Sequence, residues 1–150
     1  MRLIAALTLL FAWAPGVQTG AKDPVRTITI IGTDDMKFSI PRINARRGER
    51  LRVRLEARGV LPKVAMAHNF VLLKIGTDID KFVLEGALHR DKDFIPPAMA
   101  SFVIAKTTLA GANERVEVVF TVPTTPGMYP YICTFSGHYQ AGMKGVLVVK

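Results

Sequence analysis

The segment Arg50-Leu-Arg-Val-Arg-Leu-Glu56 indicates the fold more clearly than any other stretch of this 150-residue chain. Charged and aliphatic side chains alternate along it, which is typical of a β-strand with one buried face. We therefore expect Leu51, Val53 and Leu55 to face a core and the intervening arginines to face water. With the arginines of residues 42–47 they could instead form a docking patch for an acidic protein, but an alternating strand needs polar residues on its outer face anyway.

Further segments rich in β-branched or aromatic residues recur at short intervals, and each is bounded by turn-forming residues. They cover residues 25–31, 37–40, 69–73, 100–105, 114–122, 129–133 and 145–150. Residues 77–88 have the apolar spacing of a helix instead, with Thr77 placed to cap it. Many short strands and a single helix predict an all-β fold: an antiparallel Greek-key β-sandwich with one short helix in a connecting insertion.

Residues 1–21 are predicted to be an export signal peptide, because Arg2 precedes an apolar run that ends at Trp13 and small residues follow at 19–21. The run is shorter than the roughly 20 residues that span a bilayer, so we expect cleavage rather than a retained anchor or stable membrane insertion. Residues 22–150 have the length of a single domain. The predicted location is periplasmic or otherwise exported.

The chain is strongly basic, with a formal net charge of +8, of which the signal segment contributes one. A field of this sign favours acidic partners and speeds encounter with them. Nucleic acid is not an expected partner, because aromatic residues do not interleave with the basic ones and export argues against a genomic target.

Cys133 is the only cysteine, so the chain cannot form an internal disulfide. It is therefore a free thiol, an intermolecular crosslink or a metal ligand. Oxidation would remove an exposed free thiol from an oxidising compartment, which disfavours the first of these.

The residues around this cysteine favour the metal ligand. Four residues separate Cys133 from His138 and four more separate His138 from Met143, while His68 lies 65 residues upstream. Alone, the methionine is typical of a core and each histidine has a structural interpretation. Together, a thiolate, two imidazoles and a thioether suit one copper ion that cycles between its two valences.

Three segments resemble the cupredoxins, the type 1 blue copper proteins, most closely azurin and auracyanin. They are Asp34–Phe38, Leu61–Leu72 and Cys133–Gly145. The resemblance extends over nearly the whole of residues 22–150 and implies a cupredoxin domain with one type 1 copper ion.

By this resemblance His68, Cys133 and His138 are the equatorial copper ligands and Met143 is the axial ligand. The residue before the first histidine, whose carbonyl is a weak backbone ligand in azurin, is Ala67.

The resemblance also assigns supporting roles around the ligands. Asn69 matches an asparagine that steadies the ligand loop, and the backbone N–H of Phe135 is expected near the cysteine sulfur. The chain departs from azurin in two places: the segment Tyr139–Gly142 is one residue longer, and Gly48 stands at a half-cystine position, so the azurin disulfide is absent.

The function implied is single-electron transfer by Cu(I)/Cu(II) cycling, without enzymatic activity. The expected partners are redox proteins such as c-type cytochromes or respiratory and oxidase complexes, which dock near His138, Met36, Met66 and Phe135. A copper carrier or storage protein is the alternative, although methionine-rich and histidine-rich tracts are missing. A thiol hydrolase would need an orienting residue that no pattern supplies.

Overall fold

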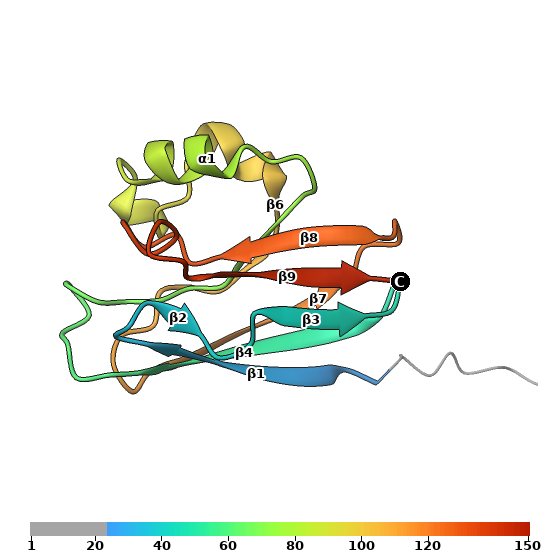
Figure 1. The fold of residues 1–150 in the computed structure, drawn as a ribbon, viewed down its shortest axis with the longest axis horizontal. Coiled ribbons are helices and arrows are strands. Elements are labelled where there is room, and N and C mark those ends of the chain that lie inside the picture. The colour runs from blue at the N-terminus through green and yellow to red at the C-terminus, as the bar shows by residue number, and fades with distance from the viewer. Residues whose placement is uncertain (1–23) are drawn as a thin grey trace, which may run out of the picture.

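The computed structural model describes residues 24–150, which form two β-sheets packed face to face (Figure 1). The first sheet has the order β2-β1-β4-β7, with strands Lys37–Phe38, Arg26–Thr33, Arg50–Arg58 and Arg115–Thr121. The second has the order β3-β9-β8-β5-β6, with strands Arg42–Ala45, Lys144–Val149, Gly127–Ile132, Val71–Leu73 and Val103–Lys106. The predicted signal peptide lies outside the described residues.

The chain passes repeatedly from one sheet to the other, which confirms the β-sandwich and is consistent with Greek-key connections. Two pairings, β1 with β4 and β3 with β9, are parallel, whereas a purely antiparallel arrangement was expected. In both cases the chain visits the opposite sheet before it returns, and such a crossover allows the second strand to run in the same direction as the first.

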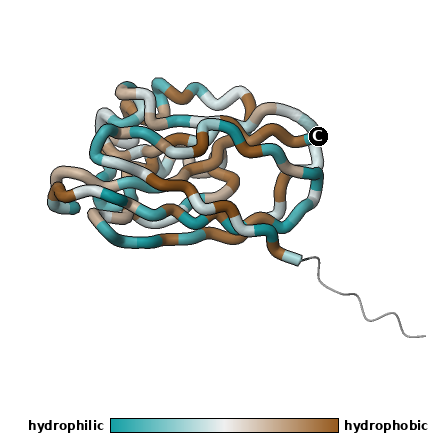
Figure 2. Tube along the Cα trace, turned by 60° about the horizontal axis from the view of Figure 1, so that its bottom comes forward, coloured by the Kyte–Doolittle hydropathy of each residue, from teal (hydrophilic) through white to brown (hydrophobic). Residues whose placement is uncertain are grey.

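Strand β4 has the expected two faces. Leu51, Val53 and Leu55 are completely buried. On the outer face, the Nε atoms of Arg52 and Arg54 lie 3.6 and 3.2 Å from the carboxylate of Glu117 on β7. Figure 2 shows hydrophobic and hydrophilic residues interspersed along the chain trace. The arginines therefore form the polar outer face of a half-buried sheet.

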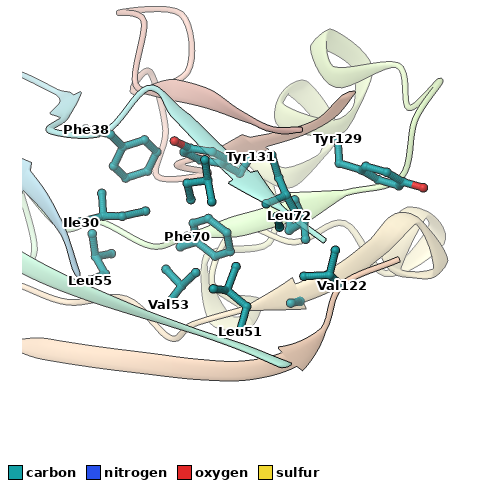
Figure 3. Packing of buried hydrophobic residues seen from close by; sticks show 14 of the residues in the cluster. Ile30, Phe38, Leu51, Val53, Leu55, Phe70, Leu72, Val122, Tyr129 and Tyr131 are labelled. Carbon is teal, nitrogen blue, oxygen red and sulfur yellow. The ribbon is translucent and has the colours of Figure 1, made fainter. Parts of the chain in front are cut away.

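Phe70 is the centre of the core between the two sheets (Figure 3). Its ring centroid lies 5.1 Å from that of Tyr131 on β8 and 6.5 Å from that of Phe120 on β7. Side chains of β4, among them Val53 and Leu55, pack below it. One aromatic side chain thus contacts both layers immediately beside the segment that contains His68.

Helix α1 (Ile79–Gly86) covers the outer face of the second sheet. Phe82 and Val83 pack with Val71 and Leu73 of β5 in a second hydrophobic cluster. Strand β5 is therefore buried on both faces, which explains its unbroken apolar sequence. No helix within residues 24–150 is long and apolar enough to cross a membrane.

The helix cap differs from the prediction. Asp78 is the N-cap, and its carboxylate accepts a hydrogen bond of 3.0 Å from the backbone N–H of Lys81. The hydroxyl of Thr77 donates to the carbonyl of Lys74 instead. Both residue types favour N-caps, so composition alone left the position ambiguous by one residue.

Two further segments differ from the sequence prediction. Residues 100–102, expected in a strand, belong to the 3-10 helix η2 (Pro97–Phe102), and β6 begins at Val103. Proline at the first position has a backbone angle that suits a helical turn. Strand β3 was not predicted; it is only four residues long and follows Pro41. A second 3-10 helix, η1, covers Arg90–Lys92.

Candidate metal centre

Three candidate ligands meet at the end of the sandwich to which β8 points. His68, Cys133 and His138 are buried, with 2, 0 and 2% exposure. The Nδ1 atoms of the histidines are 3.2 Å apart, and the Cys133 sulfur is 3.4 Å from Nδ1 of His138. One ligand atom from each of the three lies within 4.8 Å of the others, and residues 24–150 contain no second group of three or more histidine, cysteine or acidic side chains so placed.

His68 is held in place by an isolated antiparallel β-bridge to the backbone of Ala110. Its N–H donates to the carbonyl of Ala110 at 2.9 Å, and the N–H of Ala110 donates back at 2.8 Å. The preceding residue, Ala67, is fully buried, and its carbonyl lies 3.9 Å from the Cys133 sulfur. The Ala67 carbonyl therefore lies beside the sulfur of Cys133.

The other ligands come from one loop that closes on itself. The N–H of Cys133 donates to the carbonyl of Met143 at 3.1 Å, and the N–H of Met143 donates to the carbonyl of His138 at 2.9 Å. Gly137 and Gly142 adopt φ of 86° and 97°, a conformation that favours glycine, so both glycines are needed at the loop's turns. Met143 is fully buried in the main core.

Burial shifts the pKa values of all three titratable site residues in the direction that favours their uncharged forms in the metal-free protein. Desolvation raises the pKa of the Cys133 thiol to about 12, although backbone N–H groups of Asn69 and Phe135 hydrogen-bond to the sulfur and oppose the rise. Desolvation lowers the pKa of His138 to about 4, with a further lowering from His68. The pKa of His68 is also lowered by desolvation, against a smaller opposing effect of Asp34.

We expect copper binding at neutral pH to release one proton per ion. A bound cysteine is a thiolate, whereas the Cys133 thiol remains protonated below a pKa of about 12; His138, with a pKa of about 4, is already neutral and releases none. Copper affinity should therefore rise about tenfold per pH unit between about pH 7 and 8, where histidines of lowered pKa are neutral. Calorimetric titration in buffers of different ionisation enthalpy measures the number of protons, and a release of none or two would contradict this assignment.

Asn69 links the two ligand-bearing segments by hydrogen bonds. Its Oδ1 accepts from the backbone N–H of Thr134 at 2.8 Å, and its Nδ2 donates to the Thr134 hydroxyl at 2.8 Å and to the carbonyl of Asp93 at 3.2 Å. The Thr134 hydroxyl itself donates to the carbonyl of Asp93 at 2.8 Å. The asparagine thus ties the segment after Cys133 to the one after His68.

Asp93 and Phe94 were not predicted to support the site. Both adopt left-handed conformations, with φ of 54° and 60°, although neither is glycine. The Phe94 ring packs on that of Phe135 with centroids 5.1 Å apart, and Phe135 packs on His138 at 4.7 Å. The charged sequence that ends at Asp93 gives no signal of a left-handed backbone. These contacts could therefore be identified only from the structure.

Tyr139, in the longer part of the ligand loop, packs towards the helical insertion. It is half-buried against the second hydrophobic cluster, and the Lys144 ammonium lies 4.8 Å from its ring centroid. The residue anchors the ligand loop to the side of the sheet that α1 covers.

The residues present fit one copper ion. Metal–nitrogen bonds of about 2.0 Å and metal–sulfur bonds of about 2.3 Å place two ligand atoms of a shared ion about 3 to 4 Å apart. The measured separations of 3.2 and 3.4 Å lie in this range. One thiolate and two imidazoles, with a thioether beside them, are the donor set of a type 1 copper site.

Comparison with known proteins identifies the family. Residues 25–150 match the family model described as copper binding proteins, plastocyanin/azurin family. The chain therefore belongs to the plastocyanin/azurin family of copper proteins, the cupredoxins.

Individual relatives agree with this membership. Azurin of Pseudomonas aeruginosa is 38% identical over 128 residues, which cover 83% of this chain and 84% of the azurin. Auracyanin-B of Chloroflexus aurantiacus is 42% identical over 87 residues, 57% of this chain but only 37% of that longer protein. The solved structure of auracyanin A, a "blue" copper protein of the same bacterium, superposes with a TM-score of 0.74 at 30% identity, over 85% of this chain and 100% of the other.

Family membership implies electron transfer with redox partners rather than catalysis, and one type 1 copper ion as the cofactor. The fold expected from the resemblance is confirmed.

Proposed function

We propose that this protein is an exported blue copper protein that carries single electrons between redox partners. The proposal assigns His68, Cys133 and His138 as equatorial ligands and Met143 as the axial ligand, with the Ala67 carbonyl as a weak fifth contact. The observation that carries it is the convergence of one ring nitrogen from each histidine and the cysteine sulfur within 4.8 Å, on three buried residues.

Held by His68, Cys133, His138 and Met143, a copper ion would supply one-electron Cu(II)/Cu(I) chemistry, with no bond of a substrate made or broken. The protein holds the ligands in place during that change. The His68–Ala110 backbone bridge and the Asn69–Thr134 hydrogen bonds support this rigidity, because each connects a ligand-bearing segment to a segment distant in the sequence. Small ligand movements favour fast electron transfer.

Partners are proposed to dock over His138, with contacts from Met36, Met66 and Phe135. These three side chains are partly buried at the same end of the sandwich, and Leu61 beside them is 41% exposed. The Asp34 carboxylate accepts hydrogen bonds from the backbone N–H groups of residues 60 and 61, which fixes that loop to the turn containing Met36. A small apolar contact suits a short-lived complex with a c-type cytochrome or a respiratory or oxidase complex.

Export is proposed from the N-terminal sequence. Arg2, the apolar run to Trp13 and the small residues before Lys22 have the order of a cleavable signal peptide. A domain with a single cysteine, committed to copper, is compatible with an oxidising compartment because it leaves no free thiol to oxidise.

Visible and electron spin resonance spectra of the copper-loaded protein test the ligand assignment. We expect an intense blue thiolate-to-copper absorption, and Cys133→Ser should abolish it because the sulfur is the source of the transition. Ser136→Ala, an exposed change in the same loop, is the matched control and should leave the colour intact. A colourless wild-type protein, or a blue Cys133→Ser variant, would refute the assignment.

A second assay separates electron transfer from copper delivery. The ligand side chains are at most 2% exposed, which disfavours handing the metal to another protein. We expect electron exchange with a c-type cytochrome to be fast while copper stays bound in the presence of a metal-free acceptor. Rapid copper loss without electron exchange would favour the carrier function instead.

A further inference from the structure

Strand β1 has a glycine where its pattern calls for a large apolar residue. Ile28 and Ile30 point into the sandwich, and Ile30 is fully buried. Because side chains alternate, residue 32 is the next inward position, and it is the buried Gly32. Glycine weakens a strand and often marks the close approach of another group. Another part of the molecule therefore fills the space of the missing side chain.

Two of the proposed copper ligands occupy that space. A Cβ atom added to Gly32 would lie 2.9 Å from Cε of Met143 and 3.2 Å from both Cδ2 and Cγ of His68. Ordinary contacts of a Cβ are 3.4 to 4 Å, and distances below 3.0 Å essentially never occur. The thioether and the imidazole thus rest directly on the backbone of β1.

The strand cannot easily yield to relieve such a contact. Gly32 is paired on one side with Ala57 of β4, in parallel register, and on the other with Phe38 of β2. Met143 ends in a flexible methyl group, whereas the backbone of β1 is held by hydrogen bonds from both neighbours. Any added side chain would therefore move the ligands and leave the strand in place.

We propose that Gly32 is a positioning residue, whose missing side chain sets how closely the Met143 thioether approaches the metal and how the His68 ring is oriented. This inference rests on the ligand roles proposed above. The identity and distance of the axial ligand tune the reduction potential of such copper sites. Gly32 therefore contributes to the potential without itself touching the metal.

The variant Gly32→Ala tests the proposal. The new methyl group should displace the Met143 methyl and weaken the axial sulfur contact. Loss of a donor destabilises Cu(II) more than Cu(I), so we expect the reduction potential to rise. The ratio of affinities for the two valences should change at least about threefold, which is about 28 mV for one electron. The spin resonance spectrum should change with it.

The matched control is Ile30→Val, on the same face of the same strand. It removes a buried methyl group from the core and should destabilise the fold without altering potential or spectrum. A double-mutant cycle adds Met143→Ala: once the thioether is gone, Gly32→Ala should shift the potential by less than half as much. Equal shifts in both backgrounds would show that Gly32 does not act through Met143.

A metal-free measurement separates this inference from the proposed function. In apo protein, Gly32→Ala should shift the NMR signal of the Met143 methyl group, and Ile30→Val, which lacks this close approach, should shift it much less. If the wild-type copper protein is not blue, the proposed function fails while this signal still tests the contact. If the wild type is blue but Gly32→Ala leaves both the methyl signal and the potential unchanged, the role of Gly32 alone is refuted.

Discussion

Phe70→Ala should lower the free energy of unfolding of the copper-free protein by about 3 to 5 kcal/mol, as is typical for truncation of a buried phenylalanine. Phe70 is fully buried and its ring contacts Tyr131 and Phe120 from opposite sheets, so the cavity would open between the layers. Neither sheet can close it without moving a strand. Urea unfolding followed by fluorescence or circular dichroism measures the loss.

The copper-free form is needed for this measurement because bound metal would add its own binding energy to the apparent stability. The control is Leu84→Ala on helix α1, which removes a side chain that is 73% exposed. We expect this substitution to change the free energy of unfolding by no more than about 0.5 kcal/mol. A loss below about 2 kcal/mol for Phe70→Ala would mean that the two sheets repack around the gap.

Local sequence patterns predicted the parts of this fold that depend on neighbouring residues. The alternation around Val53 identified β4 and its buried face, because a strand's period is visible in seven residues. The spacing from Cys133 to Met143 likewise identified three candidate ligands in one loop. The structure adds that the loop closes by its own backbone hydrogen bonds, which the two glycines permit.

Features that depend on distant contacts could not be predicted in this way. The parallel pairing of β1 with β4 depends on a crossover through the other sheet, which no local pattern encodes. The left-handed backbone at Asp93 and Phe94 is maintained by surrounding contacts and not by glycine. The sequence interpretation ended the first strand at residue 31, so the place of Gly32 inside β1 and its contact with Met143 required the structure.

Asn69→Ala is the second change with a large expected effect. It should lower both the free energy of unfolding and the affinity for copper. The change removes two hydrogen bonds donated by the side-chain amide and leaves the buried N–H of Thr134 without its acceptor. The lost buried hydrogen bonds and the one unsatisfied donor should together lower the free energy of unfolding by about 3 kcal/mol. Because Thr134 follows Cys133 directly, copper affinity should fall about 10- to 100-fold, as for other residues that orient metal ligands.

Thr134→Val separates the two kinds of bond in this network. It removes the hydroxyl, which donates to the carbonyl of Asp93 and accepts from the side-chain amide of Asn69, but keeps the backbone N–H that donates to Asn69 at 2.8 Å. If that backbone bond is what positions Cys133, Thr134→Val should lower the free energy of unfolding by about 2 kcal/mol, for two lost side-chain hydrogen bonds, and should change the copper affinity little. Equal losses of affinity in both variants would assign the effect to the hydroxyl instead. Chemical unfolding of the copper-free proteins and competition with a copper chelator measure the two quantities independently.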